Sequence, residues 1–227
     1  MSAKRKKPIP VGAALSKEVA VLLRWVRFVN EFRSIERMIW YKGAHTQERN
    51  GEHCYQLIMV AWFIATRRLT HLDLLKIIMY IVVHDLVEIY AKDTPAFKGR
   101  LGKFDKGPSR ATKAKREAKA LRRIEREWLH IFPDVITWIK AYERQADEES
   151  RFVYALDKLL AEINIFEDEG RTDKELGVPY EEKSPYKRPR IAKHSLLLKY
   201  YDELSLFWAT YHQDRTYRPE DSKEAAE

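Results

Sequence analysis

Apolar residues recur every three or four positions along most of this chain, which is the spacing of one face of an α-helix. The pattern predicts seven helices, over about 16 to 40–43, 52–67, 71–90, 109–128, 134–145, 148–168 and 192–212. The strict alternation that marks a half-buried strand is nearly absent. The sequence therefore predicts an all-α fold.

Polar stretches that contain Gly or Pro separate these helices. The predicted loops are 41–51, 94–108 and 170–190. The last of them is a Pro-rich insert, which we expect to form a long loop or a partly mobile segment. We expect a single domain over 15–212, preceded by a flexible basic arm over 1–14 and followed by a polar tail over 213–227.

The chain of 227 residues has a formal net charge of +8 and a pI of about 9.4, a balance that favours anionic partners. Nucleic acid, phosphorylated small molecules and a membrane surface all remain open on charge alone. Cys54 is the single cysteine, so no intramolecular disulfide forms and a reducing compartment is expected. With no signal-peptide pattern and no long apolar run, we expect a cytoplasmic protein without a membrane span.

Polar residues that bear chemistry interrupt the apolar helices at a few positions. The run 77–95 reads IIMYIVVHDLVEIYAKDTP and places His84 beside Asp85 at the end of a hydrophobic stretch. Adjacent helical residues diverge by about 100°, so these two side chains can converge only on something shared, such as an ion. Glu88 follows one turn later on the same side, and Asp93 precedes Thr94-Pro95.

Two further polar residues lie in apolar helical contexts, His53 and Asp157. Together with His84 and Asp85 they form a nitrogen and oxygen ligand set on three helices, which a helical bundle can bring together in its core. Such a set suits Mn, Fe, Co, Ni or Zn better than a structural all-cysteine zinc site would. Taken singly, each residue has a structural alternative: a hydrogen-bonded core histidine, or an aspartate paired with a lysine such as Lys158.

The order of these motifs resembles the HD-domain metal-dependent phosphohydrolases, and in particular their 5′-deoxynucleotidase branch. The matching segments are GEHCYQLIMVAWF with His53, VVHDLVEIYAKDTP with His84 and Asp85, YERQADEESRFVYALDKLLAEI with Asp157, and the basic TKAKREAKAL. The resemblance covers about 35–168. It implies an HD-domain helical bundle with a metal site in its core.

The resemblance implies one divalent metal ion (Mn, Co, Fe, Ni, Zn or Mg) held by His53, His84, Asp85 and Asp157. It also implies release of phosphate from deoxynucleoside 5′-monophosphates. A divalent ion polarises phosphoryl oxygen and lowers the pKa of water, which suits this reaction. We expect Glu88 to orient or deprotonate the attacking water, with a surface salt bridge as the structural alternative. We expect Asp93 to bond a sugar or leaving-group oxygen, with an Asx-turn as its alternative.

The branch also carries an arginine-tryptophan pair upstream of the first histidine. Here the nearest match is Arg37 and Trp40, which differ from it in spacing. We expect Arg37 to pair with phosphate and Trp40 to stack on the base, or Trp40 to belong to the core. Arg49 is the further candidate for substrate binding.

Two other functions compete with this one. A deoxynucleoside triphosphate triphosphohydrolase would use the same site, with the basic helix 110–126 serving the longer phosphate chain. A catalytically silent nucleic-acid-binding protein would use the basic arm Lys4–Lys7 and the same helix. It is not favoured, because such a relic has little reason to keep Glu88 and Asp93 with all four ligands. The last helix is expected to pack on the core, with a homodimer as the alternative.

Overall fold

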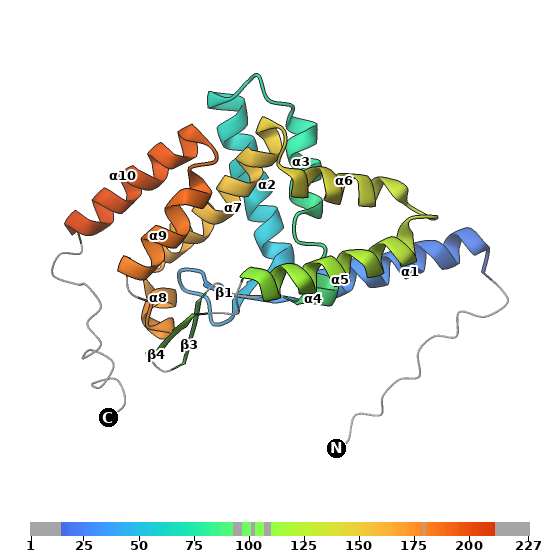
Figure 1. Cartoon of the computed structure of the whole chain (residues 1–227), viewed down its shortest axis with the longest axis horizontal. Helices are drawn as coiled ribbons and strands as arrows, with labels where there is room; N and C mark the ends of the chain where they lie inside the picture. Colours follow the sequence, from blue (N-terminus) through green and yellow to red (C-terminus); the bar gives the residue numbers. More distant parts are fainter. Residues whose placement is uncertain (1–14, 93–96, 101–102, 107–109, 179, 212–227) are drawn as a thin grey trace, which may run out of the picture.

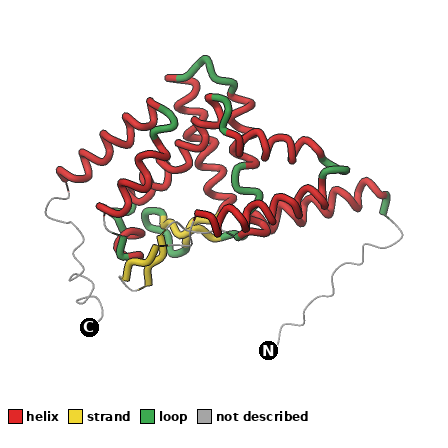
Figure 2. Tube along the Cα trace, viewed as in Figure 1, coloured by secondary structure: helices red, strands yellow, loops and turns green. Residues whose placement is uncertain are grey.

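The computed structural model describes residues 15–92, 97–100, 103–106, 110–178 and 180–211. Helices make up most of it, and the strands form two short antiparallel hairpins (Figures 1 and 2). The all-α fold expected from the sequence is confirmed. None of the described helices combines the length and the apolar composition that a bilayer crossing requires.

The central element is α7, Glu148–Glu167, which packs against α2 (Asn50–Arg68), α3 (Leu74–Val83), α6 (Pro133–Arg144) and α10 (Ser195–Tyr211). Its start is fixed by Asp147, whose side chain accepts a hydrogen bond from the Ser150 N–H. Its apolar residues face several neighbours at once. Phe152, Val153 and Leu156 are fully buried, so α7 forms the middle of the core.

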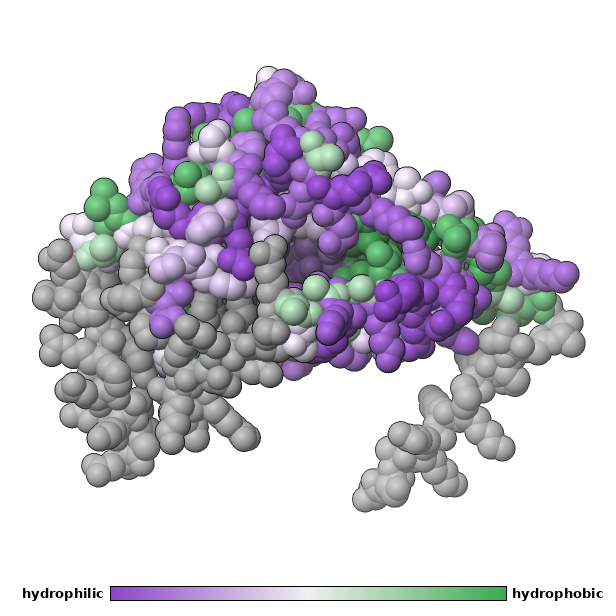
Figure 3. Space-filling view, in the orientation of Figure 1, coloured by the Kyte–Doolittle hydropathy of each residue, from purple (hydrophilic) through white to green (hydrophobic). Residues whose placement is uncertain are grey.

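Two helices flank this core at one end. α1, Lys17–Arg33, and α5, Arg110–Trp128, meet through aromatic rings, with Trp25 edge-on to Trp128 at 4.9 Å between ring centroids (Figure 1). On the face seen in Figure 3, hydrophilic side chains cover the region of α5. The basic helix expected over 109–128 is therefore present, and it packs against α4 (Glu88–Ala91) and α6.

The first predicted helix is too long, because α1 ends at Arg33 rather than near residues 40–43. Ser34 closes it by donating a hydrogen bond from its hydroxyl to the Glu31 carbonyl. The chain then forms strand β1, Glu36–Trp40, which pairs antiparallel with β2, Gln47–Arg49. The partner strand lies beyond a turn, so helical periodicity within 16–40 could not reveal it.

The helix predicted over 71–90 is interrupted after Val83. Residues 84–87 form tight turns in which the Leu86 and Glu88 N–H groups bond carbonyls three residues earlier. The chain resumes as α4 at Glu88. Within the predicted loop 94–108, residues 97–100 and 103–106 pair as strands β3 (Phe97–Arg100) and β4 (Lys103–Lys106).

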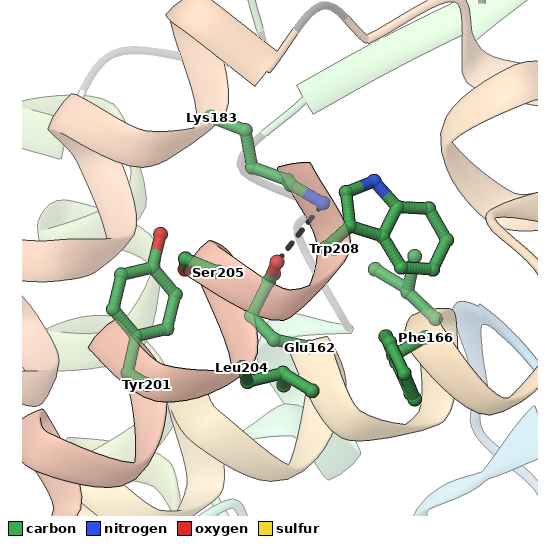
Figure 4. Close-up of a pocket in the computed structure, with 8 residues that line it drawn as sticks. Glu162, Phe166, Lys183, Tyr201, Leu204, Ser205 and Trp208 are labelled. Carbon is green, nitrogen blue, oxygen red and sulfur yellow. Dashed lines mark ion pairs between the residues drawn. The ribbon is translucent and has the colours of Figure 1, made fainter. Parts of the chain in front are cut away.

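The segment 170–190 was expected to be a loop, and this expectation is wrong for its described residues. It forms α8, Arg171–Leu176, and α9, Tyr180–Ile191. Buried charges hold both helices against α7, since the Lys183 ammonium pairs with Glu162 and Asp173. Figure 4 shows the Glu162–Lys183 pair between Tyr201 and Trp208 in a small cavity of about 30 Å³. α9 contains Pro185 and Pro189, and ion pairs with acids distant in sequence hold it against α7 and α8.

The last helix behaves as expected. α10 packs on α7 and α9, with Leu197 and Tyr201 buried. The basic arm 1–14, the polar tail from 213 and Asp93 lie outside the described residues. What the sequence predicts for the arm, the tail and Asp93 therefore stays a prediction.

Candidate metal centre

Three helices bring two imidazoles and a carboxylate to one point. His53 lies on α2, His84 caps the end of α3, and Asp157 lies on α7. One potential ligand atom from each of the three lies within 4.8 Å of the other two, and all three residues are buried. His53 Nε2 and Asp157 Oδ1 are 3.0 Å apart.

The orientation of His84 suits a metal ligand. Its Nδ1 lies 2.7 Å from the Ile81 carbonyl oxygen, and since a carbonyl only accepts, Nδ1 carries the proton and donates it. Its Nε2 is buried and makes no well-aligned hydrogen bond, although Asp85 Oδ2 lies 2.9 Å away. A buried nitrogen without an aligned partner, fixed through the other ring nitrogen, is how a ligating imidazole is arranged.

The carboxylate of Glu48 contacts the His53 ring nitrogen that faces away from Asp157. Glu48 Oε1 is 3.3 Å from His53 Nδ1, and the Glu48 side chain is 1% exposed. This contact orients His53 Nε2 toward Asp157, as carboxylates commonly do for ligating histidines. Sequence analysis did not select Glu48. Its only signal was an acidic residue five positions before a candidate ligand, which is too common to be specific.

Asp85, the fourth predicted ligand, lies beside these three residues. Its Oδ2 is 2.9 Å from His84 Nε2 and 2.8 Å from Arg37 Nη1. Although burial opposes ionisation of Asp85, His84 and Arg37 hold its pKa well below the ordinary value. Asp85 is therefore an ionised oxygen donor at the edge of the cluster.

Arg37 enters this cluster from β1. Besides Asp85, its guanidinium lies 3.2 Å from Glu48 Oε2 and 3.4 Å from Asp157 Oδ1. The sequence predicted a phosphate contact for Arg37, and the structure places it at the centre with a 13% exposed side chain. Lys158, adjacent to Asp157, adds a second cation, with 2.5 Å between its Nζ and Asp157 Oδ2.

Charge balance also fits a divalent cation. Around Arg37 lie the carboxylates of Glu48, Asp85, Glu88 and Asp157. Within the described part of the chain, these four acids outnumber the permanent cations Arg37 and Lys158 by two charges. Burial alone would lower the pKa of His84, but Asp85 raises it well above the ordinary value. A bound cation would displace that proton, because ligating imidazole must be neutral.

Glu88 follows the ligand pair and is 5% exposed. Its Oε2 accepts a 2.7 Å hydrogen bond from the Asn50 amide, which fixes the carboxylate. The carboxylate therefore lies inside the protein rather than on its surface. Asn50, at the first turn of α2, is a second residue that sequence analysis missed, because an asparagine near a helix start usually indicates only a cap.

The two remaining candidates lie farther out. Trp40 is partly buried: its backbone N–H donates a 3.1 Å hydrogen bond to Thr172 Oγ1, and the Arg171 guanidinium lies 3.9 Å from the centroid of its ring. Arg49 is exposed, and its backbone N–H bonds Glu52 at the start of α2. Within the described residues, no hydrogen bond or ion pair joins either side chain to His53, His84 or Asp157.

Two solved structures are similar to this chain over most of its length. A predicted metal-dependent phosphohydrolase from Magnetospirillum magnetotacticum MS-1 is 26% identical, with a TM-score of 0.66, and the similarity covers 82% of this chain and 90% of that one. A conserved hypothetical protein from Pyrococcus furiosus has a TM-score of 0.54 and 18% identity, covering 81% and 96%, which supports the fold alone. No curated protein matches the chain.

The family model described as HD domain matches residues 29–199, which is well over half of the chain and spans every described residue of the cluster. His53, His84 and Asp157, which meet between α2, α3 and α7, lie within that match, as does Asp85. This protein belongs to the HD-domain family.

Proposed function

We propose that this protein is a metal-dependent phosphohydrolase that removes the 5′-phosphate from deoxynucleoside monophosphates. The observation that carries the proposal is the buried meeting of His53, His84 and Asp157 in an HD-domain chain. Similarity to the Magnetospirillum protein, described as a predicted metal-dependent phosphohydrolase, supports the reaction class. The choice of deoxynucleoside monophosphates rests on the sequence resemblance.

His53, His84 and Asp157 would hold one divalent ion, with Asp85 as the adjoining carboxylate. When bound, such an ion supplies Lewis-acid polarisation and a lowered pKa for water. The protein supplies positioning: Asn50 fixes the Glu88 carboxylate, which orients the attacking water and accepts its proton. This assigns Glu88 the role of general base.

Positive charge at the site is suited to the phosphate. Arg37 presents a planar guanidinium, which matches phosphate oxygens through two parallel N–H groups. Lys158 presents an ammonium with a 31% exposed side chain on the same helix as Asp157. When phosphate binds, both cations can exchange part of their carboxylate pairing for phosphate oxygens, which neutralises charge where it develops.

The experiment combines metal analysis with product analysis. Elemental analysis of the purified chain should give one divalent ion per chain, and His84→Ala should lose it. The exposed His71, which pairs with Glu148 at 3.3 Å, gives the matched control His71→Ala, which should keep the metal. With Mn²⁺ or Co²⁺, the wild type should release orthophosphate from deoxynucleoside monophosphates. A metal-loaded protein that turns over no monophosphate contradicts the proposal.

One observation favours a second substrate on the same site. Lys113 and Glu117 of α5 lie close enough to Glu143 to influence its pKa, as does Asp85 of the cluster. The basic helix also packs against α4, which begins at Glu88 of the candidate site, and we infer that its cations could serve a longer phosphate chain. Tripolyphosphate as the product from deoxynucleoside triphosphates would support this alternative. Binding of nucleic acid without any phosphate release would support the silent HD-domain protein instead.

A further inference from the structure

The helix α4 consists of a single turn of four residues, and it begins at Glu88, the general base of the proposed reaction. Its last turn is closed by the Lys92 N–H, which donates a 2.7 Å hydrogen bond to the Glu88 carbonyl. A helix this short is not stable by itself, because most of its backbone groups find no partner within the element. Contacts from outside α4 must therefore hold it in place.

The backbone at the end of α4 is strained. Lys92 has a φ of 61° and a ψ of 153°, a combination that glycine adopts readily and other residues do not. Such a conformation persists only where the surrounding structure holds it, and it is concentrated at functional sites. The contacts that hold this turn therefore bear on the site to which α4 contributes Glu88.

The long helix α5 supplies such contacts at two consecutive residues of α4. The Arg116 guanidinium donates a hydrogen bond from Nη2 to the Ala91 carbonyl. One residue earlier, the Tyr90 hydroxyl donates a 2.5 Å hydrogen bond to Glu127 Oε2, and the Arg123 guanidinium lies 3.7 Å from the centroid of the Tyr90 ring. Figure 1 shows α4 beside α5, and the two helices pack against each other. α5 thus holds α4 through both its backbone and a side chain.

Arg116 differs from the other basic residues of α5 in its position. It precedes the buried Ala120 and Ile124 by four and eight residues, which places all three on one side of the helix. Lys119, the neighbour of Ala120, diverges from that side by about 100° and is exposed. The side of α5 that carries Arg116 is therefore the side that faces the core and α4.

The alternative is that Arg116 only caps a helix end, since basic side chains commonly bond the last carbonyls of a helix. In α4, however, the capped end and the functional residue belong to the same turn. The Glu88 side chain is fixed by the 2.7 Å hydrogen bond from Asn50, while its backbone is fixed by α4. A shift of the Ala91 carbonyl would therefore move the backbone that carries Glu88.

We propose that Arg116 is a positioning residue for Glu88. By holding the one-turn helix α4 against α5, it fixes the backbone from which the Glu88 carboxylate reaches the attacking water. The inference rests on the proposed function for the role of Glu88. It gives the basic helix a task at the site that requires neither a longer phosphate chain nor a nucleic acid.

The kinetic test compares two cations of the same helix. Arg116→Ala removes the hydrogen bond to α4, and Lys119→Ala is the matched control, because it removes an exposed cation. On a deoxynucleoside monophosphate with Mn²⁺, Arg116→Ala should lower kcat by about ten- to a hundredfold, as misplacement of a catalytic group does, with little change in KM or metal content. Arg116→Lys, which can still donate to the carbonyl, should keep more of the activity. Lys119→Ala should keep the wild-type kcat, and an equal loss in Lys119→Ala overturns the proposal.

A double-mutant cycle with Glu88→Gln separates positioning from general damage. If Arg116 acts through Glu88, Arg116→Ala should lower kcat by less than about twofold once residue 88 can no longer accept a proton. Losses that multiply in full would overturn the proposal. A raised KM with an unchanged kcat in Arg116→Ala would also overturn it and make Arg116 a substrate ligand.

Hydrogen exchange tests the contact without turnover. The amides of residues 90–92 should exchange about fivefold faster in Arg116→Ala than in the wild type or in Lys119→Ala, the effect of losing one hydrogen bond. Circular dichroism and thermal unfolding establish that the variants fold, and the milder Arg116→Gln replaces Arg116→Ala if the latter does not. Unchanged exchange overturns the proposal even in an active nucleotidase. Faster exchange in a protein that turns over no monophosphate contradicts the proposed function alone.

Discussion

Arg37 Nη1 and Asp85 Oδ2 lie 2.8 Å apart, and this contact links the β1–β2 hairpin to the metal centre. The same guanidinium reaches Glu48 and Asp157. Without a metal ion, Arg37 compensates carboxylates that are otherwise buried close together. The arginine and a divalent cation thus stabilise the same acidic cluster.

Arg37→Ala should therefore destabilise the metal-free protein and make it more dependent on metal. Removing one partner of a buried ion pair costs about 3–5 kcal/mol, because the other charges remain buried. Thermal unfolding with chelator and with Mn²⁺ measures this, and Mn²⁺ should raise the melting temperature more in the variant than in the wild type. Arg188→Ala, which breaks an exposed pair with Asp202, should cost less than about 1 kcal/mol. If Mn²⁺ raises the melting temperature of the variant and of the wild type equally, Arg37 and the metal ion do not compensate the same carboxylates.

Glu88→Gln should separate chemistry from metal binding. The amide keeps the shape and can still contact Asn50, but it cannot accept a proton from water. We expect the metal content to stay at the wild-type level, KM to change little, and kcat to fall by about 10²–10⁴. Elemental analysis and steady-state kinetics on the same preparation check this. A variant that loses its metal would make Glu88 a ligand-supporting residue, and one with unchanged kcat would remove it from the mechanism.

Arg171 of α8 holds the hairpin that carries Arg37. Its guanidinium covers the Trp40 ring, and its Nη1 donates a 2.9 Å hydrogen bond to the Ala44 carbonyl. Arg171→Ala should loosen β1 and raise KM by about two- to fivefold, in line with the ~0.5–1 kcal/mol of an exposed cation–π contact. The metal content should not change, and Arg171→Lys should restore part of the loss. A lower metal content or an unchanged KM would show that α8 does not position Arg37.

His194 should give the stability of the fold a pH dependence of its own. Burial against Phe152 lowers the pKa of His194 below its ordinary value of 6.5, and Arg151 and His71 act in the same direction, while Glu148 opposes them. The unfolded chain therefore takes up this proton first as the pH falls. Stability contributed by neutral His194 is present above about pH 6.5 and is lost below it.

Urea unfolding between pH 7.5 and 5 measures this effect as a difference between variants. The free energy of unfolding should fall less steeply with decreasing pH in His194→Gln than in the wild type. His130→Gln is the control, because His130 is exposed in the turn after α5 and its removal tests whether the loss of any histidine has the same effect. If the free energy of unfolding falls equally steeply with pH in the wild type and in His194→Gln, His194 makes no contribution to the pH dependence of stability.

Much of the metal centre could be predicted from sequence. His53, His84 and Asp157 each interrupt an apolar helical face, and the structure brings all three together. Glu48 and Asn50 could not be predicted in the same way. Glu48 acts through His53 and Arg37, and Asn50 acts through Glu88; no local spacing encodes such pairings.

By itself, the sequence determined the all-α class, the starts of most helices and the residues able to bind a metal, because helical periodicity and capping are local properties of the chain. Only the tertiary structure decided where α1 ends, why 171–176 and 180–191 are helical, and that Arg37 lies among four carboxylates. Strand pairing, buried ion pairs and converging charges each depend on partners far away in sequence. Their energies arise only when the fold brings those partners together.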